Sequence, residues 1–222
     1  VYDKNYDAAK EADVIVFAVK PQIMQQVVKE ISKNIEVKNK LILSVAAGIK
    51  ICSIENWLGQ VTAIVRVMPN MPALIQAGAS ALYANSATLD KQKNAAETIM
   101  RSVGVATWLD SEEQMDAVTA LSGSGPAYFF YFMELMESHA IEMGLNKEDA
   151  KLLTIETALG AAKMALLSSF DLKTLRKQVT STGGTTEKAL NIFMEGKLDE
   201  LVNNAMDAAK NQSIELSKSF KD

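Results

Sequence analysis

Continuous apolar runs alternate with amphipathic segments through the first half of the chain. The run Val14–Val19 is rich in β-branched residues, which predicts a parallel strand covered on both faces. Leu41–Ala47 and Ala63–Met68 repeat this pattern. Helical periodicity follows the first two runs, which predicts the helices Gln22–Lys33 and Ile51–Leu58. The alternation continues with the strand Ala79–Tyr83, the helix Leu89–Ser102 and the strand Val105–Leu109. Strands that alternate with helices in this way predict a doubly wound α/β sheet.

The second half of the chain has no convincing strand and reads as helices from Glu112 to Ser219. Asn146 and Asp171 are expected as N-caps, and Gly144 and Gly196 as the C′ residues that end helices. Two of the helices, Pro126–Met143 and Lys147–Leu167, are apolar almost all round. Since a small helical unit cannot bury so much apolar surface alone, we predict a homodimer through this unit. The expected domains are residues 1–110 and 111–222, with the boundary near Leu109–Glu112.

Composition narrows the possible functions. The chain has 222 residues and a net charge of −4, and no basic stripe is present, which argues against a nucleic-acid partner. Cys52 and His139 are the only residues of their types, so the chain alone cannot build a Cys/His metal site or a Ser/His triad, and we predict no metal. No apolar run reaches the ~20 residues of a membrane span. A lone cysteine fits a reducing compartment, and we expect a cytoplasmic protein without a membrane partner.

Two glycine-rich segments carry the most specific chemical signal. Ser122–Ala127 precedes an apolar helix, and Ser181–Thr186 precedes another. Free backbone amides and the helix dipole at such positions favour an anion, which predicts a site for a small carboxylate. The Gly-x-Gly-x-x-Gly turn that usually opens a dinucleotide-binding sheet does not occur before Val14. We therefore expect the chain to begin inside its own nucleotide-binding domain.

Five motifs stand in a defined order along the chain. They are Ala18-Val19-Lys20-Pro21, Ser44-Val45-Ala46-Ala47-Gly48, Arg66-Val67-Met68-Pro69-Asn70-Met71-Pro72-Ala73, the stretch from Asp116 to Tyr128, and Val179-Thr180-Ser181-Thr182-Gly183-Gly184-Thr185-Thr186. In sequence and order they resemble pyrroline-5-carboxylate reductases, the family that catalyses the last step of proline biosynthesis. The resemblance covers nearly the whole chain but lacks the family's opening βαβ portion, and the family usually has Pro where Thr182 stands.

The resemblance implies a partial Rossmann-type sheet, a helical dimerisation domain, and hydride transfer from NADPH, with NADH as the alternative, to the C=N bond of 1-pyrroline-5-carboxylate. It implies that the cofactor lies along the ends of three strands. The residues so assigned are Ala18, Val19, Lys20, Pro21, Ala46, Ala47, Gly48, Met68, Pro69 and Asn70. It also implies a homodimer, with a ring of dimers as the larger alternative.

For the second glycine-rich segment we favour a nest for the substrate carboxylate. Its amides would come from Gly184, Thr185 and Thr186, with the Ser181 hydroxyl beside them and Gly183 and Val179 lining the site. Thr186 is the candidate catalytic residue, donating a hydrogen bond to the ring nitrogen. The plainer alternative is a loop with Thr185 as N-cap.

Two other functions stay open at this point. The chain could be a non-catalytic dimerising fragment, because the glycine fingerprint is missing. It could also be another imine or β-hydroxyacid reductase of the same architecture, although those enzymes rely on a catalytic lysine where this chain carries Gly123-Ser124-Gly125-Pro126.

Overall fold

The computed structural model describes residues 1–218 and divides them into two compact units. The first unit comprises Val1–Pro126 together with the segment that starts at Met206, and the second comprises Ala127–Ala205. The predicted boundary at residues 110 and 111 marks the change from strands to helices. The predicted helix end at Ser219 lies outside the described residues.

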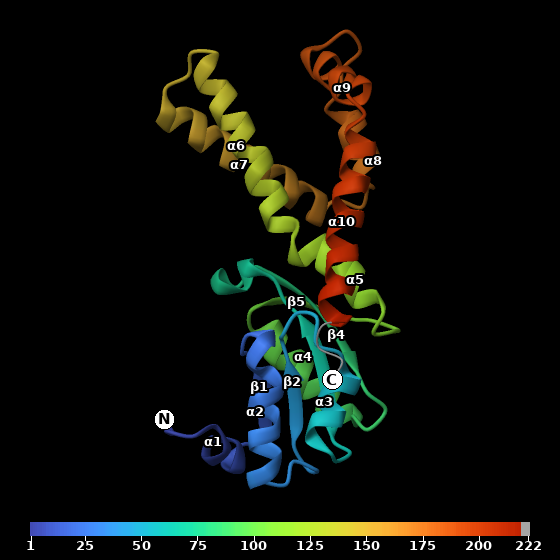
Figure 1. The fold of residues 1–222 in the computed structure, drawn as a ribbon. Coiled ribbons are helices and arrows are strands. Elements are labelled where there is room, and N and C mark those ends of the chain that lie inside the picture. Colours follow the sequence, from blue (N-terminus) through green and yellow to red (C-terminus); the bar gives the residue numbers. More distant parts are fainter. Residues whose placement is uncertain (219–222) are drawn as a thin grey trace. The chain divides into compact units, whose positions relative to one another are not determined.

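A five-stranded sheet in the order β1-β2-β3-β4-β5 forms the centre of the first unit (Figure 1). The strands are β1 (Val14–Phe17), β2 (Leu41–Ser44), β3 (Ala63–Met68), β4 (Gly78–Ala84) and β5 (Gly104–Trp108). β1, β2 and β3 are parallel, β4 is antiparallel to β3, and β5 is parallel to β4. The sheet is therefore mixed. The cause is the short connection after β3, which contains only the 3₁₀ turn η1 (Met71–Ile75), whereas a parallel crossover needs about a dozen residues.

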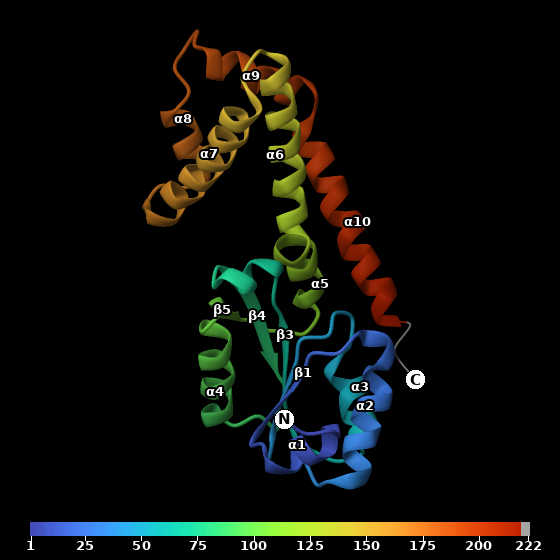
Figure 2. The same ribbon diagram turned by 90° about the vertical axis from the view of Figure 1, so that its left-hand side faces the viewer.

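Helices cover both faces of this sheet, as Figure 2 shows. One face packs against α1 (Asn5–Glu11), α2 (Pro21–Asn34) and α3 (Ile51–Leu58), through a core that includes Ile42, Ile64, Val28 and Trp57. The other face packs against α4 (Asp90–Arg101), with Leu43 and Val65 in its core. The predicted doubly wound arrangement is thus confirmed. The expectation that β1 is covered on both faces is wrong, because Val16 is 49% exposed while Ile15 and Phe17 are buried.

The chain leaves the sheet through helices that are nearly continuous. α5 (Gln114–Val118) passes into a π-helical turn, η2 (Thr119–Gly123), and then into α6 (Gly125–Glu142). The amide of Ser124 donates to the carbonyl of Thr119 at 2.8 Å, which is the five-residue spacing of a π turn. The expectation of a free helix N-terminus at Ser122–Ala127 is therefore wrong, since the backbone runs through this segment helically.

The second unit is entirely helical. It contains most of α6, then α7 (Lys147–Leu167), α8 (Leu172–Gln178), α9 (Thr185–Glu195) and the first part of α10 (Leu198–Lys218). Both predicted N-caps are confirmed: Asn146 accepts a hydrogen bond from the amide of Asp149 at 2.9 Å, and Asp171 accepts one from the amide of Thr174 at 2.7 Å.

The two glycines predicted to end helices differ in conformation. Gly144 has the expected positive φ, 104°. Gly196 has φ −75°, and the left-handed residue is the next one, Lys197, at 55°. The assignment of Gly196 as a left-handed C′ residue is wrong, because the helix continues one residue further than its sequence pattern indicates.

Candidate functional site

The three segments predicted to meet a cofactor all follow parallel strands. Ala18–Lys20 comes after β1 with Pro21 opening α2, Ala46–Gly48 comes after β2, and Met68 ends β3 and leads to Pro69 and Asn70. The carboxyl ends of neighbouring parallel strands meet at one edge, so the fold brings these segments together. This edge is where open α/β sheets bind their ligands. Because β4 and β5 run the other way, their carboxyl ends lie at the opposite edge.

The loop after β2 presents mainly backbone at this edge. Ala47 is exposed, whereas Ala46 and Gly48 are buried. Gly48 has φ +76°, a conformation that side chains disfavour. A Cβ placed on it would lie 3.6 Å from the Cβ of Leu216 and from the amide nitrogen of Ser217 in α10. The end of α10 therefore packs directly against this loop.

Asn70 is held by the protein at both ends of its amide group. Its Oδ1 accepts from the amide of Ala79 at 2.9 Å, and its Nδ2 donates to the carbonyl of Ser122 at 3.1 Å. The Ser122 carbonyl is available because Pro126, four residues later, has no N–H to donate. A Cβ on Gly123 would lie 2.5 Å from the Met68 methyl group, so the segment packs closely on the end of β3.

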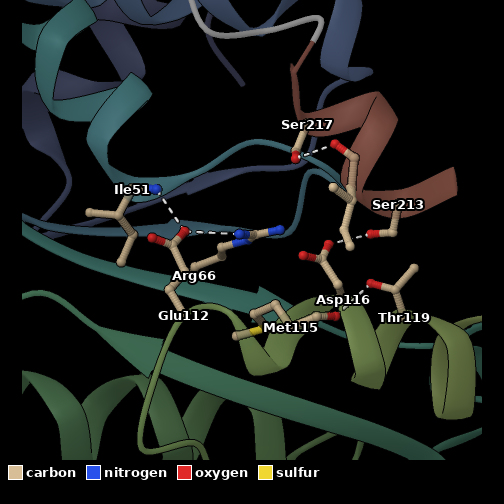
Figure 3. A network of polar contacts seen from close by, with 9 residues as sticks. Ile51, Arg66, Glu112, Met115, Asp116, Thr119, Ser213 and Ser217 are labelled. Atoms are coloured by element: carbon tan, nitrogen blue, oxygen red, sulfur yellow. Dashed lines mark hydrogen bonds and ion pairs between the residues drawn. The ribbon is translucent and has the colours of Figure 1, made fainter. Parts of the chain in front are cut away.

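Sequence reasoning missed one polar network on the sheet face that α3 covers. Oε1 of Glu112 accepts from the amide of Ile51, the first residue of α3, at 2.8 Å and from Nη1 of Arg66 at 2.9 Å. The side chains of Arg66 and Glu112 are only 5% and 17% exposed. Figure 3 shows Glu112 reaching from the segment before α5 to both partners. The sequence signal for this network was an arginine inside an otherwise apolar strand. In the sequence, Glu112 stands out only as a residue at the expected domain boundary.

A second contact in the same unit joins α5 to α10. The Ser213 hydroxyl donates to Oδ1 of Asp116 at 2.7 Å (Figure 3). Ser213 and Ser217 are both buried, on the part of α10 that belongs to the first unit. The part of α10 that starts at Met206 is therefore an integral part of the sheet unit, which the division into residues 1–110 and 111–222 does not anticipate.

The predicted carboxylate nest lies in the second unit, between α8 and α9. Val179, the residue after α8, is exposed, and Gly183 adopts φ +73° in the turn that follows. Gly184 is the N-cap of α9 and Thr185 is already helical. The alternative interpretation, in which Thr185 is the N-cap, is therefore wrong in this point.

The amides of this turn are partly in use. The Gly184 amide donates to the carbonyl of Ser181 at 3.0 Å, and the Gly183 amide donates to Oε2 of Glu187 at 2.7 Å. Within residues 1–218, no hydrogen bond engages the amides of Thr185 and Thr186. Two of the four amides from Gly183 to Thr186 are therefore available to an anion, and Glu187 shows that a carboxylate oxygen fits a neighbouring amide of the turn.

Asp171 stabilises the helix that leads into this turn. The hydrogen bonds from Thr174 hold the pKa of the Asp171 carboxyl below its ordinary value of 3.8. The carboxylate is therefore charged at neutral pH, where it also opposes the positive end of the α8 dipole favourably.

Almost nothing in the second unit is buried. Within Ala127–Ala205 only Ala150 and Thr154 are buried, whereas large apolar side chains are open, with Phe129 70% and Leu166 81% exposed. Exposed apolar surface of this extent marks a protein interface. The helices in the described part of the chain include none that is long and apolar enough to cross a bilayer.

Comparisons with known proteins agree with these features. Residues 112–216 match the family model described as pyrroline-5-carboxylate reductase dimerisation, and residues 1–48 match the one described as NADP oxidoreductase coenzyme F420-dependent. The pyrroline-5-carboxylate reductase of Pseudomonas aeruginosa is 47% identical over 98% of this chain and 80% of its own length.

Two solved structures are similar over almost the whole chain. A pyrroline-5-carboxylate reductase from Coxiella burnetii has a TM-score of 0.92 and 46% identity, covering 97% of this chain and 80% of the other. The pyrroline carboxylate reductase of Plasmodium falciparum, solved with NADP bound, has a TM-score of 0.90 and 31% identity, covering 97% of this chain and 81% of the other.

A dinucleotide-type sheet joined to a helical dimerisation region defines a dimeric NAD(P)-dependent oxidoreductase. The identities over nearly the whole chain then decide which one. The chain belongs to the pyrroline-5-carboxylate reductase family, whose members are NAD(P)H-dependent oxidoreductases acting on a C=N bond. The predicted fold class, reaction class, cofactor and homodimer are confirmed at this level. The match also decides against another imine or β-hydroxyacid reductase.

Proposed function

We propose that this chain reduces the C=N bond of 1-pyrroline-5-carboxylate to give L-proline, working as a homodimer. The observation that carries the proposal is the meeting of three predicted cofactor segments at one edge of the sheet. NADPH, when bound there, supplies the hydride that the imine carbon receives, and the imine nitrogen gains a proton, so the product is a secondary amine.

The residues at the sheet edge fit a dinucleotide. Ala18 and Ala47 are small and exposed, and Gly48 gives the loop a backbone conformation, φ +76°, that side chains disfavour. Val19, Lys20, Pro21 and Ala46 complete the first two strand ends, and Met68, Pro69 and Asn70 the third. Backbone approach of this kind needs small residues more than charged ones. It also explains how a chain with one His and one Cys can serve an enzyme.

At the start of α9 we assign the amides of Thr185 and Thr186 to the substrate carboxylate, with the Ser181 hydroxyl beside them. Gly183 and Gly184 shape the turn, and Val179 lines it. The Gly184 amide, already bonded to Ser181, is the weakest member of the predicted set. The Thr186 hydroxyl donates a hydrogen bond to the ring nitrogen. The bond forms to the neutral imine and orients the ring. Since a neutral hydroxyl is a poor acid, the proton that the nitrogen gains comes from solution.

Three broader assignments belong to the same proposal. The homodimer assembles further into a ring of dimers, the lone cysteine supports a cytoplasmic location, and the sequence boundary between the strand-containing and the helical parts lies between residues 110 and 111. The exposed apolar helices of the second unit support burial against a second copy. Light scattering of the purified protein measures the size of the assembly.

The proposal is tested on the protein as its gene encodes it, by following NADPH oxidation with 1-pyrroline-5-carboxylate. Thr186→Val keeps the shape of the side chain and removes the hydroxyl, and we expect kcat/KM to fall about tenfold, the effect of losing one hydrogen bond. Thr182→Val, in the same exposed turn, is the matched control and should stay within about twofold.

Either of two results would overturn the assignment. Equal losses in both variants would show that the turn is merely sensitive to substitution. A folded, dimeric wild-type protein without activity would leave the non-catalytic dimerising fragment as the better description.

A further inference from the structure

The loop Val45–Lys50 connects β2 to α3 and carries three of the residues assigned to the cofactor. Its first end is fixed by the sheet, because Ser44 is paired in β2 and the amide of Val45 donates to the carbonyl of Phe17 at 3.1 Å. Its second end is the start of α3, where Lys50 is the N-cap and provides no side-chain hydrogen bond. A helix start without such a cap depends on another acceptor for its amides.

Glu112 is that acceptor. Its Oε1 binds the Ile51 amide at 2.8 Å although the two residues are 61 positions apart in the chain. A carboxylate at this place satisfies an otherwise unpaired donor and also opposes the positive end of the α3 dipole. The segment before α5 thereby anchors the second end of the loop.

Arg66 fixes the position of Glu112. Arg66 lies in β3, in register with Ser44 of β2 and Tyr83 of β4. Its Nη1 donates to the same Oε1 of Glu112 at 2.9 Å. Strand β3 is hydrogen-bonded to strands on both sides, so the backbone that carries this donor is fixed by the sheet. One carboxylate oxygen therefore links the rigid sheet to the end of the loop, as Figure 3 shows.

The loop has little freedom on its remaining side. Gly48 packs against Leu216 and Ser217 of α10 at about van der Waals distance. The contacts with α10 and the hydrogen bond from Ile51 to Glu112 therefore restrain the backbone of Ala46–Gly48 from two sides. A binding surface made of backbone keeps its affinity only if the backbone is pre-organised.

We propose that Glu112 is a positioning residue for cofactor binding, acting through the Ile51 amide and Arg66 on the loop Val45–Lys50. The proposal rests on the cofactor site proposed above. It predicts an effect on NADPH affinity that is separate from the effect on substrate affinity and from stability.

The test measures NADPH binding by fluorescence titration and steady-state kinetics in the protein as its gene encodes it. In Glu112→Ala we expect NADPH affinity to fall about tenfold, as for the loss of one charge-assisted hydrogen bond, while the KM for the imine at saturating NADPH changes by less than about threefold. Glu112→Gln keeps an oxygen that can accept from the Ile51 amide, and its NADPH affinity should lie between those of wild type and Glu112→Ala.

Asn85→Ala is the matched control. Asn85 also makes several hydrogen bonds in the sheet unit, to Ile64, Thr62 and Glu55, but none to the loop or to Glu112. It should lower stability and leave NADPH affinity within about twofold. Amide hydrogen exchange without cofactor should quicken around Ile51 in Glu112→Ala and stay unchanged there in Asn85→Ala.

The possible results separate the two proposals. Wild type that binds no NADPH overturns the cofactor site and this inference with it. If wild type binds NADPH and Glu112→Ala binds it equally well, only the positioning role is overturned. Glu112→Gln serves for this comparison if Glu112→Ala does not fold. A loss of affinity in Asn85→Ala equal to that in Glu112→Ala would reduce the role of Glu112 to general stability.

Discussion

The buried pair of Arg66 and Glu112 gives a quantitative test of the structure through a double-mutant cycle. Arg66 pairs with the Glu112 carboxylate at 2.9 Å and lies under the helices that cover the sheet, with 5% of its side chain exposed. Glu112 is 17% exposed and has a second donor, the Ile51 amide. The two single substitutions therefore leave different groups behind.

The expected magnitudes follow from what remains buried. Glu112→Ala leaves the guanidinium without its carboxylate, and the free energy of unfolding should fall by about 3 to 5 kcal/mol. Arg66→Met fills most of the space of the arginine stem and leaves a carboxylate that still accepts from Ile51, so we expect a loss of about 2 to 3 kcal/mol. The double variant keeps no unpaired charge and loses only packing and one helix-start acceptor, about 2 kcal/mol.

Equilibrium unfolding in urea, followed by circular dichroism at one fixed protein concentration, measures the three losses, since a dimer's stability depends on concentration. The double variant should be more stable than Glu112→Ala alone. Because the pair is buried, raising the salt concentration should change the coupling little. Additive losses, within about 0.5 kcal/mol, would refute the reasoning, because they would mean that the two side chains do not interact.

Three further predictions test other parts of the structure. In Gly104→Ala the new Cβ would clash with the carbonyl oxygen of Gly78 and lie 2.5 Å from its nitrogen, so the free energy of unfolding should fall by about 3 kcal/mol or more. In Gly59→Ala the φ is also positive but the new Cβ has no neighbour within 4 Å, so thermal unfolding should show a loss of about 1 to 2 kcal/mol. Asp171→Ala removes the cap of α8 and should lower the thermal unfolding temperature at neutral pH. Because the pKa of the folded-state carboxyl is lowered from 3.8, the stabilisation is present above that pH and is lost as the pH falls through the lower folded value. The hydrogen bond from Trp108, with a second from Arg101, lowers the pKa of Glu97 from 4.5, so the fluorescence of Trp108 in a Trp57→Phe background should titrate with a midpoint below 4.5 and lose this transition in Glu97→Gln.

Features set by neighbouring residues could be predicted from the sequence. The parallel strands β1, β2 and β3, the N-caps Asn146 and Asp171, and Pro21 at the start of α2 all follow from local patterns, and the structure has each of them. For the caps and Pro21, local rules succeed because the hydrogen bonds and steric limits involved lie within one turn of the chain. For the strands, they succeed because a continuous apolar run itself indicates burial in a sheet.

Features that depend on distant partners could not be predicted in the same way. The direction of β4 depends on how short the connection after β3 is, and the hydrogen bond from Asn70 to the Ser122 carbonyl joins residues 52 positions apart. Glu112 was visible in the sequence only as one charge near a boundary. Its role depends on a contact 61 residues away, for which no spacing rule exists.

The same distinction applies to the site. Motif order located the three strand ends and the turn before α9, because small residues and glycines at those places are a local signal. What keeps such backbone surfaces rigid is supplied from elsewhere: Glu112 holds one end of the loop after β2, and Leu216 and Ser217 of the last helix pack on Gly48. A site built from backbone amides has few side chains of its own to lose, so its affinity should respond most to substitutions at these distant anchors.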